Sequence, residues 1–420
     1  MGEQVPAGKP FEIPKQEVWD AWLKVKANGG APGADGQSIE DFGADLKNNL
    51  YKVWNRMSSG SYFPPPVMAV EIPKAHGAGV RILGVPTVAD RVAQTVVAAR
   101  LEKEVEPKFH DDSYGYRPGR SALDAVGKCR ERCWKHDWVV DLDIRKFFDS
   151  VRWDFIVRAV EANTADAWVI LYVKRWLSAP LRMPGGSLAE RDRGTPQGSA
   201  VSPVLANLFL HYAFDMWMAR KFPAIPFERY VDDAVVHCRS EKQARMIRAA
   251  LEERMEQVGL SLHPGKTRLV YCKDAIRRGS AEHVSFGFLG FTFRARGART
   301  RHGRVFTGFG PAISKDALNK ISAEVRSWRL HQHSDWSFGQ LARWINPIVR
   351  GWMQYYGAFY RSALYPVLKR INGYLVRWLR KKYKRLRTFK KAHEAWGRVT
   401  AQYPLWFAHW KWVTGHWREG

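Results

Sequence analysis

The sequence predicts an α+β fold in which helices accompany an antiparallel sheet, followed by a largely helical C-terminal region. Residues 227–238 hold two apolar runs separated by Asp232 and Asp233. This pattern is typical of a β-hairpin, because Val, Tyr and Phe favour strands and Asp favours turns. Residues 138–144 alternate apolar and acidic side chains, which indicates a second strand. Amphipathic patterns predict helices over 16–27, 90–106, 154–176, 202–212, 241–258, 313–329, 337–360 and 365–384.

The two strands carry acidic side chains that suit a metal site. Adjacent carboxylates repel each other unless a cation lies between them, and Mg²⁺ prefers a few carboxylates together with substrate phosphates. On the acidic strand, Val139, Asp141 and Asp143 share one face. A third carboxylate beside Asp232 and Asp233 would complete a two-metal site for phosphoryl transfer. For an isolated pair of aspartates, the alternative is an ordinary solvated turn.

The charge of the chain points to a polyanionic partner. The 420 residues are enough for two to three domains, and they include 67 Lys and Arg against 41 Asp and Glu, a net charge of +26. Nucleic acid is the first interpretation and an acidic membrane the second. The 19 tryptophans favour nucleic acid because aromatic rings stack on bases, although we expect more than half of them in the core.

The four cysteines fit a reducing compartment. Cys129, Cys133, Cys238 and Cys272 form no Cys-x-x-Cys pair, so a zinc ribbon is a poor interpretation. Cys129 and Cys133 lie one turn apart on a predicted helix, where we expect small buried side chains. No signal peptide and no apolar run of membrane length is visible. We therefore expect a cytoplasmic protein with no membrane partner.

Three motifs make the chain resemble a known family. The sequence Tyr-Val-Asp-Asp at 230–233 resembles the active-site signature of reverse transcriptases. The stretch 141–149 is similar to their first catalytic motif, and Gly-Thr-Pro-Gln-Gly-Ser at 194–199 is similar to the loop beneath the incoming nucleotide. More specifically, nearly the whole chain resembles the proteins encoded by bacterial group II introns, which combine reverse transcriptase and maturase activity.

This resemblance implies a right-hand polymerase with fingers, an antiparallel-sheet palm and a helical thumb. The motif around Trp352 resembles the maturase domain of group II intron proteins. The implied divisions are 1–65 for an N-terminal extension and the start of the fingers, 66–135 for the fingers, 136–305 for the palm with finger elements inserted, 306–368 for the thumb and maturase domain, and 369–420 for a basic, Trp-rich segment that binds RNA or DNA.

The resemblance also implies the chemistry. A primer 3′-hydroxyl attacks the α-phosphate of a dNTP on an RNA template, with two Mg²⁺ ions as cofactors and Mn²⁺ as the alternative ion. Asp143, Asp232 and Asp233 are the implied catalytic residues and metal ligands, together with Ile144. We assign Asp143 rather than Asp141, because the family's ligand precedes its aromatic gate by five residues and Phe148 has that spacing.

Five residues are implied to bind the nucleotide. Lys74 and Arg81 lie on a hairpin expected around 70–86, where they would grip the triphosphate. Phe148 would exclude a 2′-hydroxyl, with core packing as the alternative, and Gln197 would contact the nucleotide. Lys266 would protonate the leaving pyrophosphate or contact the backbone.

Further residues are expected to bind nucleic acid. Arg117 and Arg120 would follow backbone phosphates, or would only brace their turn. Phe288 and Gly290 would approach the primer terminus. Residues 369–391 contain eleven Lys or Arg and no Asp or Glu, interleaved with aromatic residues, which suits structured RNA. From this run we single out Arg377, Arg380, Lys381 and Lys384.

The expected partners are group II intron RNA, an RNA template with a DNA primer, dNTPs and target DNA. The tail lacks the Cys/His array of the endonuclease-bearing relatives, so we expect no endonuclease. Val231 replaces the alanine commonest in group II intron proteins, which leaves the subclass open. Three alternatives remain: a related reverse transcriptase in host defence or DNA repair, an RNA-binding maturase with a dead polymerase, and an RNA-dependent RNA polymerase.

Overall fold

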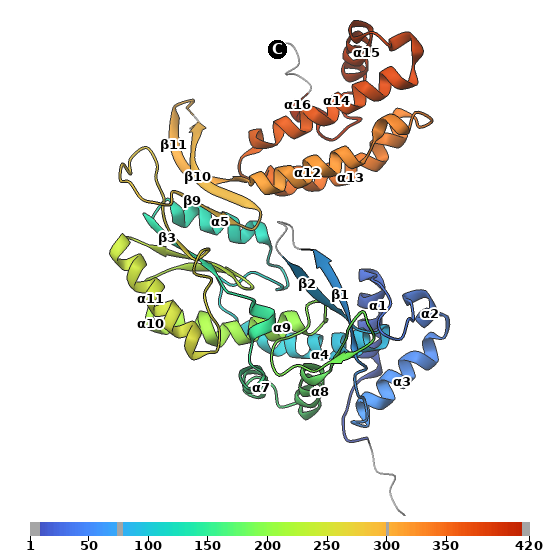
Figure 1. Cartoon of the computed structure of the whole chain (residues 1–420), viewed down its shortest axis with the longest axis vertical. Coiled ribbons are helices and arrows are strands. Elements are labelled where there is room, and N and C mark those ends of the chain that lie inside the picture. The colour runs from blue at the N-terminus through green and yellow to red at the C-terminus, as the bar shows by residue number, and fades with distance from the viewer. Residues whose placement is uncertain (1–8, 74–78, 300–301, 414–420) are drawn as a thin grey trace, which may run out of the picture. The chain divides into compact units, whose positions relative to one another are not determined.

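The computed structural model describes residues 9–73, 79–299 and 302–413, and Figure 1 shows their order along the chain. The chain combines helices with mainly antiparallel sheets, as predicted, and divides into two compact units. Unit 1 comprises Met1–Ser121, Leu142–Val236 and Arg245–Thr267, and unit 2 comprises Ala122–Asp141, His237–Ala244 and Arg268–Gly420.

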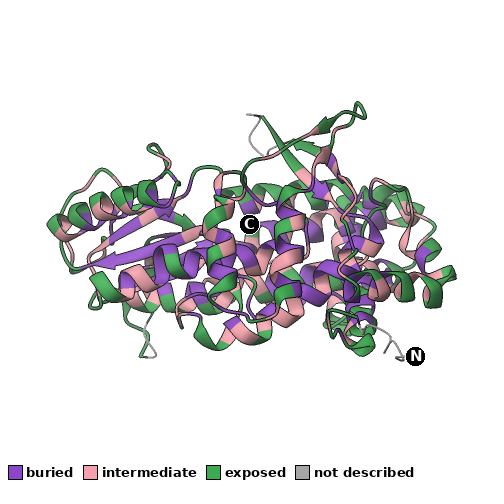
Figure 2. Cartoon of the chain, turned by 90° about the horizontal axis from the view of Figure 1, so that it is seen from below, coloured by how far each residue is buried: buried purple, intermediate pink, exposed green. Residues whose placement is uncertain are grey.

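Helix α4 (Val88–Val105) is the central helix of unit 1. Its buried residues lie on every side of the helix, as expected for a helix enclosed by others, and Figure 2 shows such buried positions in purple. Five α-helices pack against α4: α1 (Lys15–Asn28), α2 (Ile39–Ala44), α3 (Leu46–Ser58), α8 (Ala167–Ser178) and α9 (Ser202–Leu210). Unit 1 also contains the 3-10 turn η1 (Glu106–Lys108), α6 (Phe147–Ser150) and α7 (Trp153–Glu161).

A small sheet of unit 1 carries the predicted basic hairpin. Strands β1 (Val67–Pro73) and β2 (Val80–Val85) are antiparallel, with Ile72 opposite Arg81. The sheet order is β2-β1-β4-β5, and its last two strands are β4 (Leu181–Arg182) and β5 (Leu188–Ala189). The hairpin prediction is confirmed, while Lys74 lies outside the described residues.

A second sheet carries both acidic segments. Its order is β6-β7-β3-β8, where β6 is Phe227–Tyr230, β7 is Asp233–Cys238, β3 is Trp138–Asp143 and β8 is Arg268–Tyr271. β6 and β7 are antiparallel, and the pair Tyr230–Asp233 closes their turn. The predicted hairpin and acidic strand are therefore both confirmed.

The single helix predicted over 154–176 is wrong, because α7 and α8 are separate helices. Between them, Asn163 Nδ2 donates to the carbonyl of Ala159 over 2.8 Å, and Thr164 Oγ1 accepts from the amide of Asp166 over 3.2 Å. These side chains satisfy backbone groups that a continuous helix would have paired.

A π-helical turn, η2 (His211–Asp215), follows α9 and leads into α10 (Met216–Lys221). The sequence pattern predicted the helix at α9 but not this wider turn. Such turns are rare and often occur at functional sites. Helix α11 (Glu241–Gln257) then follows β7, as predicted.

Unit 2 holds a three-stranded antiparallel sheet of order β11-β10-β9, made of β9 (Ser285–Phe288), β10 (Phe291–Arg299) and β11 (Val305–Ile313). Leu289 and Gly290 join the first two strands with φ of 50° and 79°. Two positive values are typical of the tight turn that matches strand twist.

The three predicted C-terminal helices are confirmed as α12 (Lys315–Ser327), α13 (Phe338–Tyr356) and α14 (Tyr365–Lys382). They pack around one apolar core in which Trp328, Trp378, Trp396 and Trp410 are buried. Unit 2 also contains α5 (Ala122–Cys133), η3 (Leu330–Gln332), η4 (Arg361–Leu364), η5 (Lys384–Leu386), α15 (Phe389–Gln402) and α16 (Trp410–Val413). Of the helices described, none is long and apolar enough to cross a membrane.

Candidate active site

The turn between β6 and β7 presents Asp232 and Asp233 in a strained backbone. Val231 has φ of 59°, in the left-handed region that β-branched residues avoid. Such a conformation costs about 1–3 kcal/mol and persists only where the surroundings hold it. Val231 is 4% exposed, and both aspartates are half-buried. Contacts with neighbouring residues, and not the backbone preference of Val231, therefore hold the turn in this conformation.

Arg229 is the main support of this turn, a role that the sequence motifs did not predict. Its side chain is 1% exposed. Nε and Nη2 donate to the two carboxylate oxygens of Asp215 over 2.7 and 2.6 Å. Nη1 donates to the carbonyl of Val231 over 3.0 Å and to Asn207 Oδ1 over 3.1 Å, and Nη2 also donates to Ser113 Oγ over 2.8 Å. The π-helical turn supplies Asp215. The one local signal was an arginine inside a segment that the apolar pattern predicts to be a strand.

The segment 113–116 packs directly on the turn. A Cβ on Gly115 would lie 2.6 Å from Val231 Cγ2 and 2.7 Å from its amide nitrogen, so a larger residue does not fit. The amide of Tyr114 donates to the carbonyl of Arg229 over 2.8 Å. Asn207 Nδ2 donates to the carbonyl of Gly115 over 2.6 Å. Glycine is needed here for close approach of two backbones.

Arg117 braces this segment. It is 8% exposed, pairs with Glu106 over 2.8 Å and donates to the carbonyls of His110 and Ser113 over 2.6 and 2.7 Å. Arg120 is more exposed and donates to the carbonyl of Asp111 over 2.9 Å. These contacts favour the bracing role, which we had left open, over phosphate binding by Arg117.

Asp143 and Asp232 lie within electrostatic reach of each other. Burial raises the pKa of Asp232, and the negative charge of Asp143 raises it further, while Arg81 acts in the opposite direction. Asp143 ends β3, and its Oδ2 lies 3.4 Å from Lys266 Nζ. The next residue, Ile144, pairs with Leu262 in an isolated bridge. The predicted residues Asp143, Asp232, Arg81 and Lys266 are thus brought together by unit 1.

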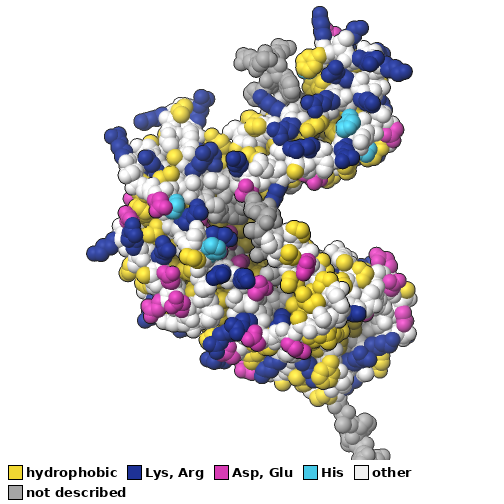
Figure 3. All heavy atoms as spheres, viewed as in Figure 1, with side chains coloured by type: hydrophobic (Ala, Val, Ile, Leu, Met, Phe, Trp, Pro, Cys, Tyr) yellow, Lys and Arg dark blue, Asp and Glu magenta, His cyan; other side chains and the backbone are white. Residues whose placement is uncertain are grey.

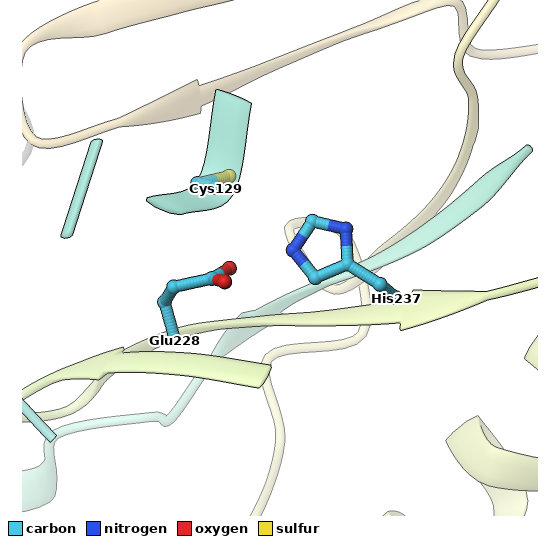
Figure 4. A group of neighbouring side chains, drawn as sticks. All are labelled: Cys129, Glu228 and His237. Carbon is cyan, nitrogen blue, oxygen red and sulfur yellow. The ribbon is translucent and has the colours of Figure 1, made fainter. Parts of the chain in front are cut away.

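The aspartates suit a divalent cation that also binds the phosphates of a substrate. Within the described ranges, a set of three potential ligand atoms all within 4.8 Å of one another occurs at Cys129, Glu228 and His237, three buried side chains shown in Figure 4. We assign no metal to these three residues. The three aspartates are not such a closed set. An open set fits Mg²⁺, which keeps several ligands from water and substrate phosphates.

The loop 194–199 is anchored to Phe148 at its start. Gly194 has φ of 78°, and a Cβ there would lie 2.7 Å from the carbonyl oxygen of Phe148. That oxygen accepts from the amide of Thr195 over 2.7 Å. The ring of Phe148 is half-buried and meets Phe147 edge-on at 5.2 Å. The backbone of Phe148 therefore holds the start of the loop.

The same loop is anchored to β2 at its end. The amide of Gly84 donates to the carbonyl of Gln197 over 2.7 Å. Gly198 has φ of 112°, and a Cβ there would lie 2.5 Å from the carbonyl oxygen of Gly84. Because Arg81 is on β2 as well, the strand and the loop form one connected support for Arg81 and Gln197.

Phe288 and Gly290 belong to unit 2. Phe288 is 1% exposed, so its ring is part of the core. The carbonyl of Gly290 accepts from Ser314 over 3.0 Å, and Tyr355 Oη donates to the carbonyl of Leu289 over 2.8 Å. The ring of Phe288 is therefore unavailable for contact with nucleic acid, whereas Gly290 is exposed.

Four exposed cations lie at the end of α14 and just beyond it. We call them the C-terminal basic cluster: Arg377, Arg380, Lys381 and Lys384. Between them, Trp378 and Leu379 are buried, so the helix presents an apolar face inward and a basic face to solvent. Figure 3 shows many Lys and Arg side chains over the C-terminal helices.

A comparison with family models identifies the class of this protein. The model for reverse transcriptase (RNA-dependent DNA polymerase) matches residues 72–293, more than half of the chain, which therefore belongs to the reverse transcriptase family. The model for the group II intron, maturase-specific domain matches residues 318–396, which include the C-terminal basic cluster. Both expectations from the sequence motifs are confirmed.

Curated relatives agree with this classification. The chain is 27% identical over 317 residues to Protein YkfC of Escherichia coli, covering 65% of this chain and 78% of the relative. It is 31% identical over 181 residues to the group II intron-encoded protein LtrA of Lactococcus lactis, covering 43% of this chain and 30% of the relative. A putative COX1/OXI3 intron 1 protein of Saccharomyces cerevisiae is 28% identical, with 47% of this chain and 23% of the relative covered. The chain thus spans less than a third of these two intron-encoded relatives.

Proposed function

We propose that this protein extends a DNA primer on an RNA template with dNTPs, and that it binds group II intron RNA to assist splicing and mobility at a target DNA. The observation that carries the first part is the meeting of Asp143 and Asp232 with the cations Arg81 and Lys266 inside the reverse transcriptase domain. Carboxylates for metal ions and cations for phosphates are the two requirements of phosphoryl transfer.

Asp143, Asp232 and Asp233 would hold two Mg²⁺ ions, with the backbone carbonyl of Ile144 as a further ligand and Mn²⁺ as the alternative ion. When bound, these ions supply activation of the primer hydroxyl and neutralisation of the leaving pyrophosphate. The protein's own part is to hold the carboxylates in place. Arg229 does so by fixing the carbonyl of Val231, the residue before Asp232.

The nucleotide would lie over the support formed by β2 and the loop 194–199. Arg81 would bind its phosphates, with Lys74 outside the described residues, and Gln197 would contact the nucleotide itself. The ring of Phe148 would lie under the sugar and exclude a 2′-hydroxyl. Lys266, beside Asp143, would protonate the leaving group or neutralise its charge.

In this proposal the chain is a right hand with fingers at 66–135, a palm at 136–305 and a thumb at 306–368, preceded by an RNA-contacting extension and followed by the basic segment 369–420. The protein would act in the cytoplasm, since its four cysteines are free thiols, as expected in a reducing compartment. The maturase-specific domain favours an intron partner over a role in host defence or DNA repair.

Primer extension on an RNA template, with dNTPs and rNTPs in parallel, tests the polymerase. Asp232→Asn removes a metal-binding charge at almost constant shape, so we expect extension to be lost while RNA affinity and the melting temperature stay near wild type. Extension by the variant at nearly the wild-type rate would refute the assignment of Asp232. Preference for rNTPs in the wild type would favour an RNA polymerase.

A charge-neutralised variant tests the maturase. Replacing all four residues of the C-terminal basic cluster by Gln should weaken intron binding and splicing at low Mg²⁺, while extension on a short pre-annealed template persists at saturating protein. The matched control neutralises four exposed cations outside the maturase-specific domain, Lys103, Arg220, Lys221 and Lys242. An equal loss of splicing and extension, or the same loss in the control, would contradict a dedicated RNA surface.

A further inference from the structure

A buried carboxylate on α4 lies outside the proposed catalytic group. Asp90 is fully buried, and its Oδ1 accepts from Tyr62 Oη over 2.8 Å and from Trp176 Nε1 over 2.7 Å. Its Oδ2 accepts from Gln94 Nε2 over 2.8 Å. Burial raises the pKa of Asp90 to about 6, and the three donors act against that rise. At neutral pH and above, the group is a carboxylate that accepts from three donors.

Gln94 connects Asp90 to the loop 194–199, because it bonds to both. Its Oε1 accepts from Ser199 Oγ over 2.7 Å and from the amide of Ala200 over 2.8 Å. A backbone amide can only donate, so the carbonyl end of Gln94 must face Ala200 and its NH₂ end must face Asp90. The indole N–H of Trp176 is also an obligatory donor. Because Trp176 and the NH₂ end of Gln94 both donate to residue 90, that residue must offer two acceptor atoms, as the carboxylate of Asp90 does.

The loop that Gln94 holds is the one that carries Gln197. Ser199 ends this loop, two residues after Gln197. Its other supports include the contacts of Gly194 and Gln197 with Phe148 and Gly84 described above. Helix α4 is enclosed by other helices, so Gln94 acts from a rigid element. Rigid supports of this kind fix the geometry of a binding group.

We propose that Asp90 and Gln94 are positioning residues for the incoming nucleotide, which set the orientation of the loop bearing Gln197. This inference rests on the proposed function, in which Gln197 contacts the nucleotide. Asp90 and Gln94 do not touch the substrate. Their effect appears in the KM for dNTP, because they fix where the contacting group lies before the nucleotide binds.

The chemistry of the pair provides a rescue experiment. Asp90→Asn cannot accept from both Trp176 and Gln94, because one end of the new amide is a donor. Gln94→Glu keeps the acceptor for Ala200 but sets a second carboxylate against Asp90. In the double variant D90N/Q94E, the carboxylate introduced at position 94 accepts from Ala200, from Ser199 and from the amide introduced at position 90. The carbonyl of that amide accepts from Trp176 and Tyr62, so the exchange again provides an acceptor for Trp176, Tyr62, Ser199 and Ala200.

We expect each single variant to raise the KM for dNTP about tenfold or more, since an unsatisfied buried donor or acceptor displaces its neighbours, with a smaller change in kcat. The double variant should return KM to within about threefold of wild type. Tyr62→Phe is the matched control: it removes one hydrogen bond from Asp90 but leaves the contacts of Trp176 and Gln94, so it should lower the melting temperature without raising KM.

The outcomes separate the two proposals. A wild-type protein without primer extension would refute the proposed function itself. An active wild type whose folded single variants keep a normal KM would overturn the positioning role, as would a folded double variant with a KM raised as in the single variants. An equal rise in KM for Tyr62→Phe would reduce the network to general stability. If a single variant fails to fold, the KM of the double variant still tests the positioning role, because a raised KM would overturn it.

Discussion

Arg229→Lys tests most directly how the catalytic turn is held. The guanidinium is buried and donates two hydrogen bonds to Asp215 and one each to Asn207, Val231 and Ser113. Lysine keeps the positive charge but has one ammonium in place of a planar fork, so it cannot reach acceptors on four different residues at once.

The expected magnitudes follow from these contacts. Each neutral hydrogen bond contributes about 0.5–1.5 kcal/mol, so losing the three neutral bonds should lower the free energy of unfolding by about 1.5–4.5 kcal/mol. The backbone strain at Val231 costs about 1–3 kcal/mol. This cost is as large as the stabilisation that the hydrogen bond from Arg229 to the carbonyl of Val231 contributes. The turn should therefore shift once that bond is lost. A misplacement of about 1 Å costs about 100-fold in rate, and we expect a fall of that size in kcat.

Urea unfolding measures the first effect, and primer extension at saturating dNTP, under conditions where the variant is folded, measures the second. Arg277→Lys is a matched control. Arg277 is also largely buried, pairs with Asp137 and bonds the carbonyls of Cys133, Trp134 and Cys272, none of which belongs to the catalytic turn. It should lose stability but keep kcat. A wild-type kcat in folded Arg229→Lys, or an equal fall in the control, would refute the reasoning.

Three further predictions concern nucleotide selection, catalysis and RNA binding. Phe148→Ala should raise the use of rNTPs relative to dNTPs by about tenfold, measured as a ratio of kcat/KM values; an unchanged ratio in a folded variant would leave Phe148 a packing residue. Lys266→Met should change the free energy of unfolding by less than about 1 kcal/mol, because its pair with Asp143 is exposed, yet lower kcat about 100-fold. A normal kcat would show that Lys266 has no role in catalysis beyond its salt bridge with Asp143. RNA affinity should fall steeply with salt, and neutralising the C-terminal basic cluster should reduce the slope of log affinity against log salt by up to about 3; an unchanged slope would show that these cations remain solvated when RNA binds.

Much of the fold could be read from local patterns. The acidic strand, the hairpin bearing Asp232 and Asp233, the basic hairpin and the three C-terminal helices each depend on a periodicity within one segment, and the structure has all of them. The break between α7 and α8 was missed because side-chain contacts at Asn163 and Thr164 interrupt a pattern that is otherwise continuous. The π-helical turn was missed for a similar reason, since an extra residue in one turn hardly changes an apolar pattern.

The sequence by itself also determined the class of chemistry, because the acidic pair, the acidic strand and the loop 194–199 are contiguous motifs whose residue types carry their meaning. Only the tertiary structure decided what holds them. Arg229 meets Ser113 across 116 positions of the chain, and Gln94 meets Ser199 across 105. It also showed Arg117 engaged with Glu106 and the ring of Phe288 buried. The physical reason is that hydrogen bonding and burial depend on which distant segments fold together, and no local pattern encodes the partner of a polar side chain.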